Sequence, residues 1–314
     1  MNSDSRFAVL LLLSLSTFLV FSLYFGPLNR NNREREVKGT PIITLSASEG
    51  RETEIILTGD IMLGRTTELK SVGKSDFAYP FREVYGILQD ADIVFANLES
   101  PIIDKCPPHE SGYKFCASPE MLEGLVLSGV DVVTLANNHS LNYGKEGLSQ
   151  TISNLNEHGI KATGIGSLEV IKRNNTIFGF LGFDFVSRQP TRKDYDLVKD
   201  SDTKADILIA GVHWGEEYEA KHNRFQRLWA EKLVESGADI IVGHHPHWVQ
   251  DIEEIQGVPV FYSLGNFVFD QMWSEETKRG VIVKLTFTGH ELTDQQTLKT
   301  YLSSWAQPVI MASE

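Results

Sequence analysis

Six short apolar runs, each followed directly by polar residues, most restrict how this chain can fold. They cover residues 54–59, 92–96, 130–135, 206–212, 239–242 and 258–262. Runs of this length, rich in Ile, Val and Leu, are typical of strands buried on both faces. Helical patterns lie between them, starting at Ser118 and covering 144–158 and 225–236. This alternation predicts an α/β domain with βα units and a largely parallel central sheet, and a late run at 281–285 is expected to be antiparallel.

The amino-terminal segment has a different composition. Residues 7–25 are almost entirely apolar and carry no charge, and a membrane-spanning helix needs roughly 20 such residues. We predict a membrane anchor over 1–27, a polar linker over 28–52 and one domain over 53–314. A cleaved signal peptide is the alternative, although the apolar run is long for one and no small-x-small site lies just before Gly26.

The side of the membrane is indicated by two opposing signals. Arg30, Arg33, Arg35 and Lys38 follow the apolar segment and only Arg6 precedes it, which favours a cytoplasmic domain. The two cysteines, at 106 and 116, bracket a loop with two prolines and a glycine. This spacing favours a disulfide, which forms in oxidising compartments, and two unrelated thiols are the alternative.

The net charge limits the class of partner. At −13, the chain lacks the clustered Lys and Arg that nucleic acid binding requires, so no nucleic acid partner is expected. A phosphate substrate is still compatible with this charge, because bound metal ions can supply the local positive charge.

Chemically active side chains follow the ends of the predicted strands. In open α/β sheets, ligands bind at the carboxyl ends of the strands. Each residue alone has a structural explanation, such as a helix cap or a buried hydrogen-bonded histidine. Together they form a mixed set of carboxylates, amides and imidazoles that suits one or two divalent ions. In chain order they are Asp60, Glu99, Asn137, Asn138, His139, His213, His244, His245, His247 and Asn266.

The polar residues lie in six motifs along the chain. They are Gly59-Asp60-Ile61-Met62, Asn97-Leu98-Glu99, Ala136-Asn137-Asn138-His139, His213-Trp214-Gly215-Glu216-Glu217-Tyr218, Gly243-His244-His245-Pro246-His247 and Tyr262-Ser263-Leu264-Gly265-Asn266-Phe267. In this order they resemble the CapA family, bacterial and archaeal proteins linked to poly-γ-glutamate capsule synthesis. The resemblance covers about residues 55–310. The family is similar to calcineurin-like metallophosphoesterases, which implies a four-layer α/β/β/α sandwich.

The resemblance implies roles for individual residues. His139 would be the general acid or would orient the leaving group, and the metal ligands would be Asp60, Glu99, Asn138, His213, His245 and His247. Two departures leave a single-metal site open, because Met62 replaces a histidine and Glu99 replaces a bridging aspartate. From their chemistry and position we expect substrate contacts from Arg65, Asn137, Glu217 and Asn266, with Asp104 and His109 in a lid.

These inferences lead to two functional hypotheses. The first is a membrane-anchored, metal-dependent hydrolase for a phosphoester or amide in capsule, poly-γ-glutamate or related envelope polymer synthesis. It would use one or two divalent ions, such as Mn, Fe, Zn or Mg. The second is a non-catalytic accessory protein for export or assembly of an anionic envelope polymer. For both we expect a single-pass protein of the cell membrane with an extracytoplasmic domain. Its partners would be the membrane, the polymer or its precursor, and other capsule-synthesis membrane proteins.

Overall fold

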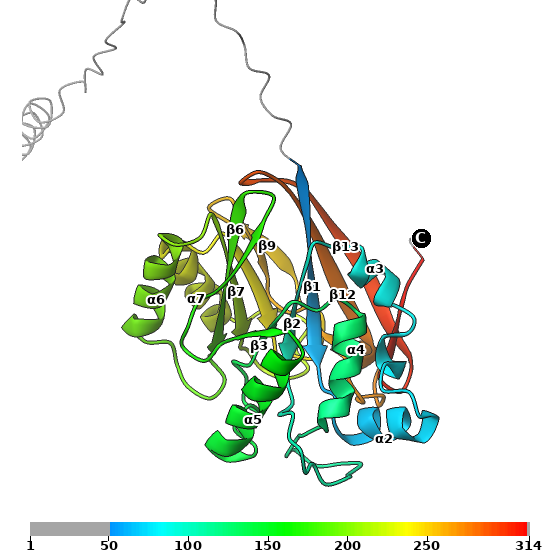
Figure 1. Cartoon of the computed structure of the whole chain (residues 1–314). Coiled ribbons are helices and arrows are strands. Elements are labelled where there is room, and N and C mark those ends of the chain that lie inside the picture. Colours follow the sequence, from blue (N-terminus) through cyan, green and yellow to red (C-terminus); the bar gives the residue numbers. More distant parts are fainter. Residues whose placement is uncertain (1–50, 313–314) are drawn as a thin grey trace, which may run out of the picture. The chain divides into compact units, whose positions relative to one another are not determined.

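Two β-sheets form the centre of the folded part of the chain (Figure 1). The computed structural model describes residues 51–312. The predicted anchor over 1–27 and the linker up to residue 50 lie outside these residues. No helix within 51–312 is long and apolar enough to cross a membrane.

The first sheet has the strand order β14-β13-β12-β1-β2-β3-β4, and β11 pairs with β1. The strands β1 to β4 run parallel to one another, whereas β12, β13 and β14 are joined antiparallel. The members of this sheet are β1 (Glu52–Ile61), β2 (Ile93–Leu98), β3 (Val132–Thr134), β4 (Lys161–Thr163), β11 (Asn266–Val268), β12 (Arg279–Thr288), β13 (Glu291–Ser304) and β14 (Gln307–Ile310).

The second sheet has the order β5-β6-β7-β8-β10-β9. Its four central strands are parallel, and the edge strands β5 and β9 are antiparallel to their neighbours. The members are β5 (Glu169–Arg173), β6 (Thr176–Asp184), β7 (Ile207–His213), β8 (Ile240–His244), β9 (Ile252–Ile255) and β10 (Val258–Phe261).

The three predicted helices are present as the helical segment η3–α4, α5 and α7. Ser118 and Pro119 begin the first, and the Asn223 side chain accepts the Phe225 and Gln226 amides at the start of α7. The helical elements are α2 (Arg65–Lys74), η2 (Tyr79–Phe81), α3 (Tyr85–Gln89), η3 (Pro119–Met121), α4 (Leu122–Leu127), α5 (Gly144–Glu157), α6 (Arg192–Asp202), α7 (Arg224–Glu235) and α8 (Glu275–Lys278).

The prediction of a single central sheet is wrong, because the parallel strands are divided between two sheets. Apolar runs show that strands are buried on both faces, but they do not show which strands pair. The antiparallel strand expected at 281–285 is confirmed as part of β12, which pairs with β1. The two-sheet arrangement that the family resemblance implied is present.

Alternate side chains of the central strands enter different cores, as the two-residue period of a strand requires. In β1, Ile55 and Leu57 pack between the two sheets, whereas Ile56 packs toward the helices that cover the first sheet. In β7, Ile209 lies between the sheets and Leu208 packs with residues of α6 and α7. Figure 1 shows α6 and α7 on one outer side of the strands and α3 and α4 on the other.

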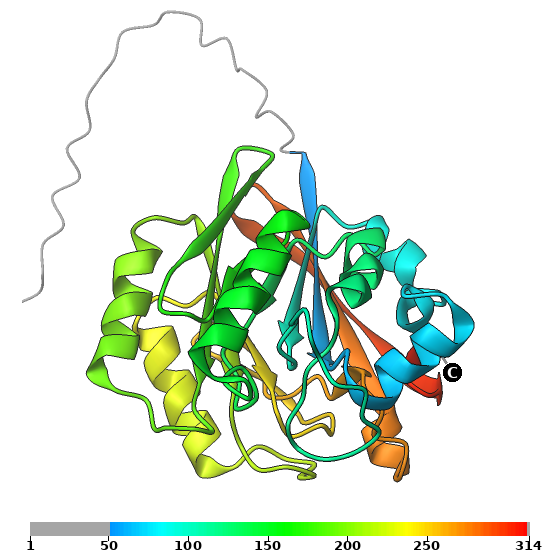
Figure 2. The same cartoon turned by 60° about the horizontal axis from the view of Figure 1, so that its bottom comes forward.

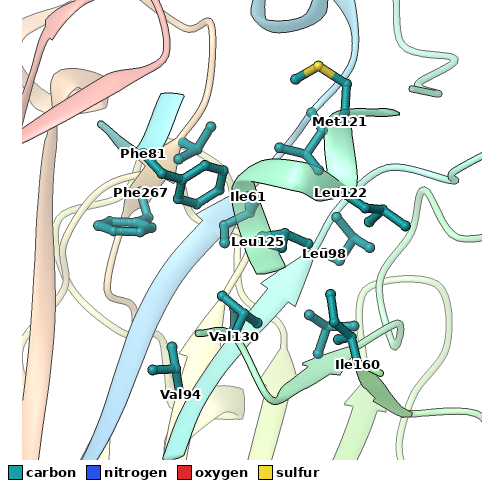
Figure 3. Close-up of a cluster of buried hydrophobic side chains, with 14 of the residues drawn as sticks. Ile61, Phe81, Val94, Leu98, Met121, Leu122, Leu125, Val130, Ile160 and Phe267 are labelled. Carbon is teal, nitrogen blue, oxygen red and sulfur yellow. The ribbon is translucent and has the colours of Figure 1, made fainter. Parts of the chain in front are cut away.

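The outer core of the first sheet is shown in Figure 3, where Leu122 and Leu125 of α4 lie over Val94 and Leu98 of β2. The core between the sheets contains large aromatic residues from both. Phe95 of the first sheet stacks on Phe180 of the second with ring centroids 5.4 Å apart. This contact helps to fix how one sheet lies on the other.

Replacing Phe180 by alanine should therefore destabilise the protein strongly. Truncating a buried Phe leaves a cavity and costs about 3–5 kcal/mol of unfolding free energy. Denaturant unfolding would measure this loss. The matched control is Phe225→Ala, because Phe225 is 44% exposed and its loss should stay within about 0.5 kcal/mol. Equal losses in the two variants would contradict the two-sheet core.

The predicted disulfide between Cys106 and Cys116 is confirmed, with the two Cα atoms 5.7 Å apart. It closes the loop of residues 106–116, which we call the disulfide loop. Replacing both cysteines by serine should lower the unfolding free energy by about 2–4 kcal/mol, because the unfolded chain is no longer constrained. Thermal unfolding with and without a reductant would test this, and the double variant should be insensitive to the reductant.

Candidate metal centre

The polar residues predicted from the strand ends meet at one edge of the two sheets, which Figure 2 turns toward the viewer. Asp60 of β1 lies beside Asn97 of β2, and His213 of β7 lies beside His244 of β8 in the strand register. The first sheet therefore supplies Asp60 and Glu99, and the second sheet supplies His213, His245 and His247. Because the carboxyl ends of parallel strands share one edge, both sets reach the same space.

Gly59 brings another segment into this space. A Cβ atom at Gly59 would lie 2.1 Å from the Gly265 carbonyl oxygen, so only glycine permits the approach. The Asp60 amide then donates to that carbonyl at 2.9 Å. As a result Asn266 pairs with Asp60 in the parallel β1–β11 ladder.

Asp60 is fully buried and accepts two hydrogen bonds. Asn97 Nδ2 donates to Oδ1 at 2.8 Å, and the backbone N–H of His245 donates to Oδ2 at 3.2 Å. His247 Nδ1 also lies 3.2 Å from Oδ2. Burial alone raises the pKa of Asp60, but the His247 hydrogen bond and the charges of His244 and His247 outweigh it, so the pKa is lowered.

His247 is oriented by Asn266. The Asn266 amide group donates to Gln271 and to the Thr277 carbonyl, so its Oδ1 is left to accept from His247 Nδ1 at 3.0 Å. The proton on Nδ1 leaves Nε2 free to bind a metal. This geometry favours a positioning role for Asn266, and its predicted substrate contact stays a prediction.

Asn97 links the two halves of the site and was not among the predicted site residues. Besides its bond to Asp60, its Nδ2 lies 3.4 Å from His213 Nδ1, and its Oδ1 accepts from Asn137 Nδ2 at 3.1 Å. Asn137 in turn donates to the Leu98 carbonyl, so its side chain is held by the protein. One feature of the sequence indicates this role. Asn97 lies two residues before Glu99, so the two side chains point to the same face of the strand.

Glu99 is buried, and its Oε1 has no hydrogen-bond partner. His139 Nε2 lies 3.7 Å from this oxygen and His247 Nε2 lies 3.8 Å from it. Burial, together with the negative charges of Asp60 and Glu217, raises the pKa of Glu99 well above its usual range. A buried carboxylate oxygen without a donor is expensive unless a cation neutralises it.

The imidazoles of His213 and His245 are held neutral. Burial lowers the pKa of His213 well below its usual range, and it lowers the pKa of His245 to about 3. Their ring centroids are 4.8 Å apart, and His213 Nε2 lies 3.0 Å from Asn138 Oδ1. Neutral imidazole is the form that binds metals.

The loop that carries His245 and His247 has an unusual backbone. Their φ angles are +98° and +58°, in a region that residues other than glycine rarely adopt. Such strain persists where the surrounding structure enforces it, commonly at functional sites. The conformation places both rings against the carboxylates, and the His245 Nδ1 atom is buried without a partner.

The donor atoms cluster as a divalent ion would require. Ligand atoms of Asp60, Glu99 and His247 all lie within 4.8 Å of one another, and so do those of Glu217, His245 and His247. The two groups share His247, and unpartnered atoms of Glu99 and His245 face no protein donor. The residues therefore fit one or two divalent ions. Glu217 is grouped with His245 and His247, and its predicted substrate contact stays a prediction.

Met62 does not join these donors. Its side chain is buried in an apolar cluster with Phe115 and Phe269. The thioether thus packs in a hydrophobic place and adds no donor to these groups.

His139 lies at the rim of the site under the disulfide loop. Its ring stacks on Phe115 with centroids 3.9 Å apart. Asn142 Oδ1 accepts the Phe115 amide at 2.6 Å and lies 3.1 Å from His139 Nδ1. Nδ1 therefore carries a proton and Nε2 faces Glu99. Burial lowers the pKa of His139.

Arg65 is held by three groups beside the centre. Its side chain forms an ion pair with Asp270 and donates to the Gly112 carbonyl at 2.9 Å. The guanidinium carbon lies 4.5 Å from the Phe115 ring centroid. Its predicted contact with substrate stays a prediction.

The parts of the disulfide loop that reach this region are Gly112 and Phe115, whereas His109 bonds within the loop to the Pro107 carbonyl. Asp104 bonds through its backbone to Gln150.

Two solved structures share the fold. A hypothetical protein from Thermus thermophilus aligns with a TM-score of 0.52 and 14% identity, over 79% of this chain and 98% of that one. A novel phosphatase from Mycoplasma pneumoniae aligns with a TM-score of 0.53 and 14% identity, over 79% and 93%. At these identities the likeness concerns the fold alone.

Two curated proteins are similar in sequence. The capsule biosynthesis protein CapA of Bacillus anthracis is 33% identical over 265 residues, which span 75% of this chain and 64% of the relative. The PGA biosynthesis protein CapA of Bacillus subtilis is 32% identical over 245 residues, which span 69% and 63%. The chain thus matches somewhat less than two thirds of the length of either relative. Residues 54–187 and 184–271 match the family described as bacterial capsule synthesis protein PGA_cap, and the chain therefore belongs to this family.

Proposed function

We propose that the protein is a metal-dependent hydrolase that acts on a phosphoester or amide during synthesis of a capsule polymer such as poly-γ-glutamate. The observation that carries the proposal is the buried donor cluster around His247, in which Glu99 Oε1 and His245 Nδ1 have no protein partner. Both similar curated proteins are named for capsule or PGA biosynthesis, which supports the pathway.

The residues of the site can divide the chemistry between them. Asp60, Glu99, Asn138, His213, His245 and His247 would hold one or two divalent ions. Such ions polarise a phosphoryl or carbonyl oxygen and lower the pKa of water. Because Asn142 fixes one proton on Nδ1, Nε2 of neutral His139 would first accept a proton and would then transfer it to the leaving group.

The non-catalytic alternative is favoured by one observation. Met62 packs in an apolar cluster and adds no donor beside Asp60. An ion held there would therefore have fewer ligands. An accessory protein for polymer export or assembly could keep a single structural ion. For both functions we propose a domain anchored by residues 1–27 outside the cytoplasm, a placement supported by the Cys106–Cys116 disulfide.

Metal content and hydrolysis together test the proposal. The purified protein should contain at least one equivalent of a divalent metal and should hydrolyse bis(4-nitrophenyl) phosphate or an amide substrate. His213→Ala and His245→Ala should each weaken metal binding at least about tenfold, since each removes a ligand. The matched control is His290→Ala, because that side chain is 62% exposed.

Three results are informative. Wild-type protein without bound metal after incubation with Mn, Fe, Zn or Mg would contradict the metal centre. Bound metal without turnover of phosphoester, amide or polyglutamate would favour the accessory function. Equal metal loss in the His290→Ala control would show that the assay reports general damage.

The Glu99→Gln variant should show how much the negative charge of Glu99, as distinct from its shape, contributes to stability and to metal binding. Glutamine has nearly the same shape but removes a buried negative charge beside Asp60, so the metal-free variant should be at least as stable as wild type. At a metal concentration of a hundred times the wild-type Kd, wild type should gain about 2.7 kcal/mol. A variant with tenfold weaker affinity would gain only about 1.4 kcal/mol. Thermal unfolding with metal and with a chelator would measure both, and equal gains would remove Glu99 from the ligand set.

A further inference from the structure

A groove of about 420 Å³ opens beside the metal centre, and aromatic side chains line it. These are Tyr113, Tyr218, Trp273 and Trp305. Trp273 is 61% exposed and Trp305 is 41% exposed, and they are the two exposed tryptophans within residues 51–312. Exposing such large apolar rings together is unfavourable in water, and such patches commonly mark binding sites.

The groove is connected to the metal centre through Tyr218. Its ring centroid lies 4.8 Å from that of Trp273 and 6.1 Å from that of His247. Tyr218 has a φ of +65°, so this placement is held in a rarely adopted backbone conformation. The Tyr218 side chain therefore lies between the ring of His247 and a ligand that packs on Trp273.

The charges of the groove disfavour a polyanion. Its only cationic lining residue, Arg65, is paired with Asp270, and Glu110 adds an exposed carboxylate. Lys70 is outside the lining, with its Nζ 6.0 Å from the Trp305 ring centroid. A run of glutamates would meet no free cation among the lining residues and would be repelled by Glu110.

The remaining polar partners suit hydroxyl groups. Thr66 and Ser111 supply hydroxyls, Gln271 supplies an amide, and Glu110 accepts hydrogen bonds. A pyranose ring has an apolar face that packs on indole or phenol rings and hydroxyls at its edge that bond to such partners. We infer that the groove binds a sugar ring and that the substrate of the metal centre carries a glycosyl unit next to the bond that is cleaved.

This inference rests on the proposed hydrolase function only for the position of the cleaved bond. Sugar binding itself can be measured in the presence of a chelator. We would titrate the protein with trisaccharides of glucose, galactose and N-acetylglucosamine and record tryptophan fluorescence and binding heat. A γ-linked triglutamate and choline serve as the anionic and cationic probes.

At least one trisaccharide should bind and shift the tryptophan emission. Trp273→Ala and Trp305→Ala should each weaken binding about tenfold, as the loss of a stacked ring implies. Trp273→Phe should retain most of the affinity. Phe225→Ala is the matched control, because Phe225 is an exposed aromatic residue outside the groove, and it should bind as wild type does. Circular dichroism would verify that each variant is folded.

The outcomes separate the two proposals. Failure of all three trisaccharides to bind, or tighter binding of triglutamate or choline, would overturn the sugar groove even if bis(4-nitrophenyl) phosphate is hydrolysed. Sugar binding without hydrolysis would leave the groove intact and count against the hydrolase. Phe225→Ala, outside the groove, should leave both sugar binding and hydrolysis of this sugar-free substrate unchanged.

Discussion

Two buried carboxylates, Asp60 and Glu99, set the constraint on which the rest of this structure depends. Within residues 51–312 their ion-pair partners are all histidines, and burial holds His213 and His245 in the neutral form. Buried charge without a compensating cation is costly in a protein interior. Protonation of Glu99 can relieve the cost in the metal-free state, and a divalent ion relieves it more completely. The same arrangement that would destabilise an ordinary core thus creates affinity for metal.

The sandwich makes this arrangement possible because neither sheet contains the site alone. Asp60 and Glu99 lie at strand ends of the first sheet, and His213, His245 and His247 lie at strand ends of the second. Aromatic packing between the sheets, such as Phe95 on Phe180, fixes the separation of the two sets. Asn97 then joins them through hydrogen-bond distances to Asp60 and His213. Substitutions in the core between the sheets should therefore change the distances among the residues of the candidate metal centre.

The sequence predicted which residues come together better than it predicted the sheets. Asp60, Glu99, His213, His245 and His247 lie close together because strand ends converge, a rule that holds whichever strands pair. The division into two sheets follows from long-range pairing, which apolar runs do not encode, and the polar strand β13 carried no apolar signal. Asn97 and Asn142 were not predicted, because the sequence around an asparagine does not show which side chain its amide group will bond to. The roles of Asn266 and Glu217 likewise depend on distances that only the folded chain provides.

The disulfide loop connects the chemistry to the ligand. Phe115 stacks on His139, and the Gly112 carbonyl accepts from Arg65, which lies at the edge of the aromatic groove. Tyr113, between these two residues, is 83% exposed and lines the groove. One short loop therefore contacts His139 and the paired arginine and also lines the groove. Because the Cys106–Cys116 disulfide restricts this loop, a ligand that orders Tyr113 would lose less entropy on binding.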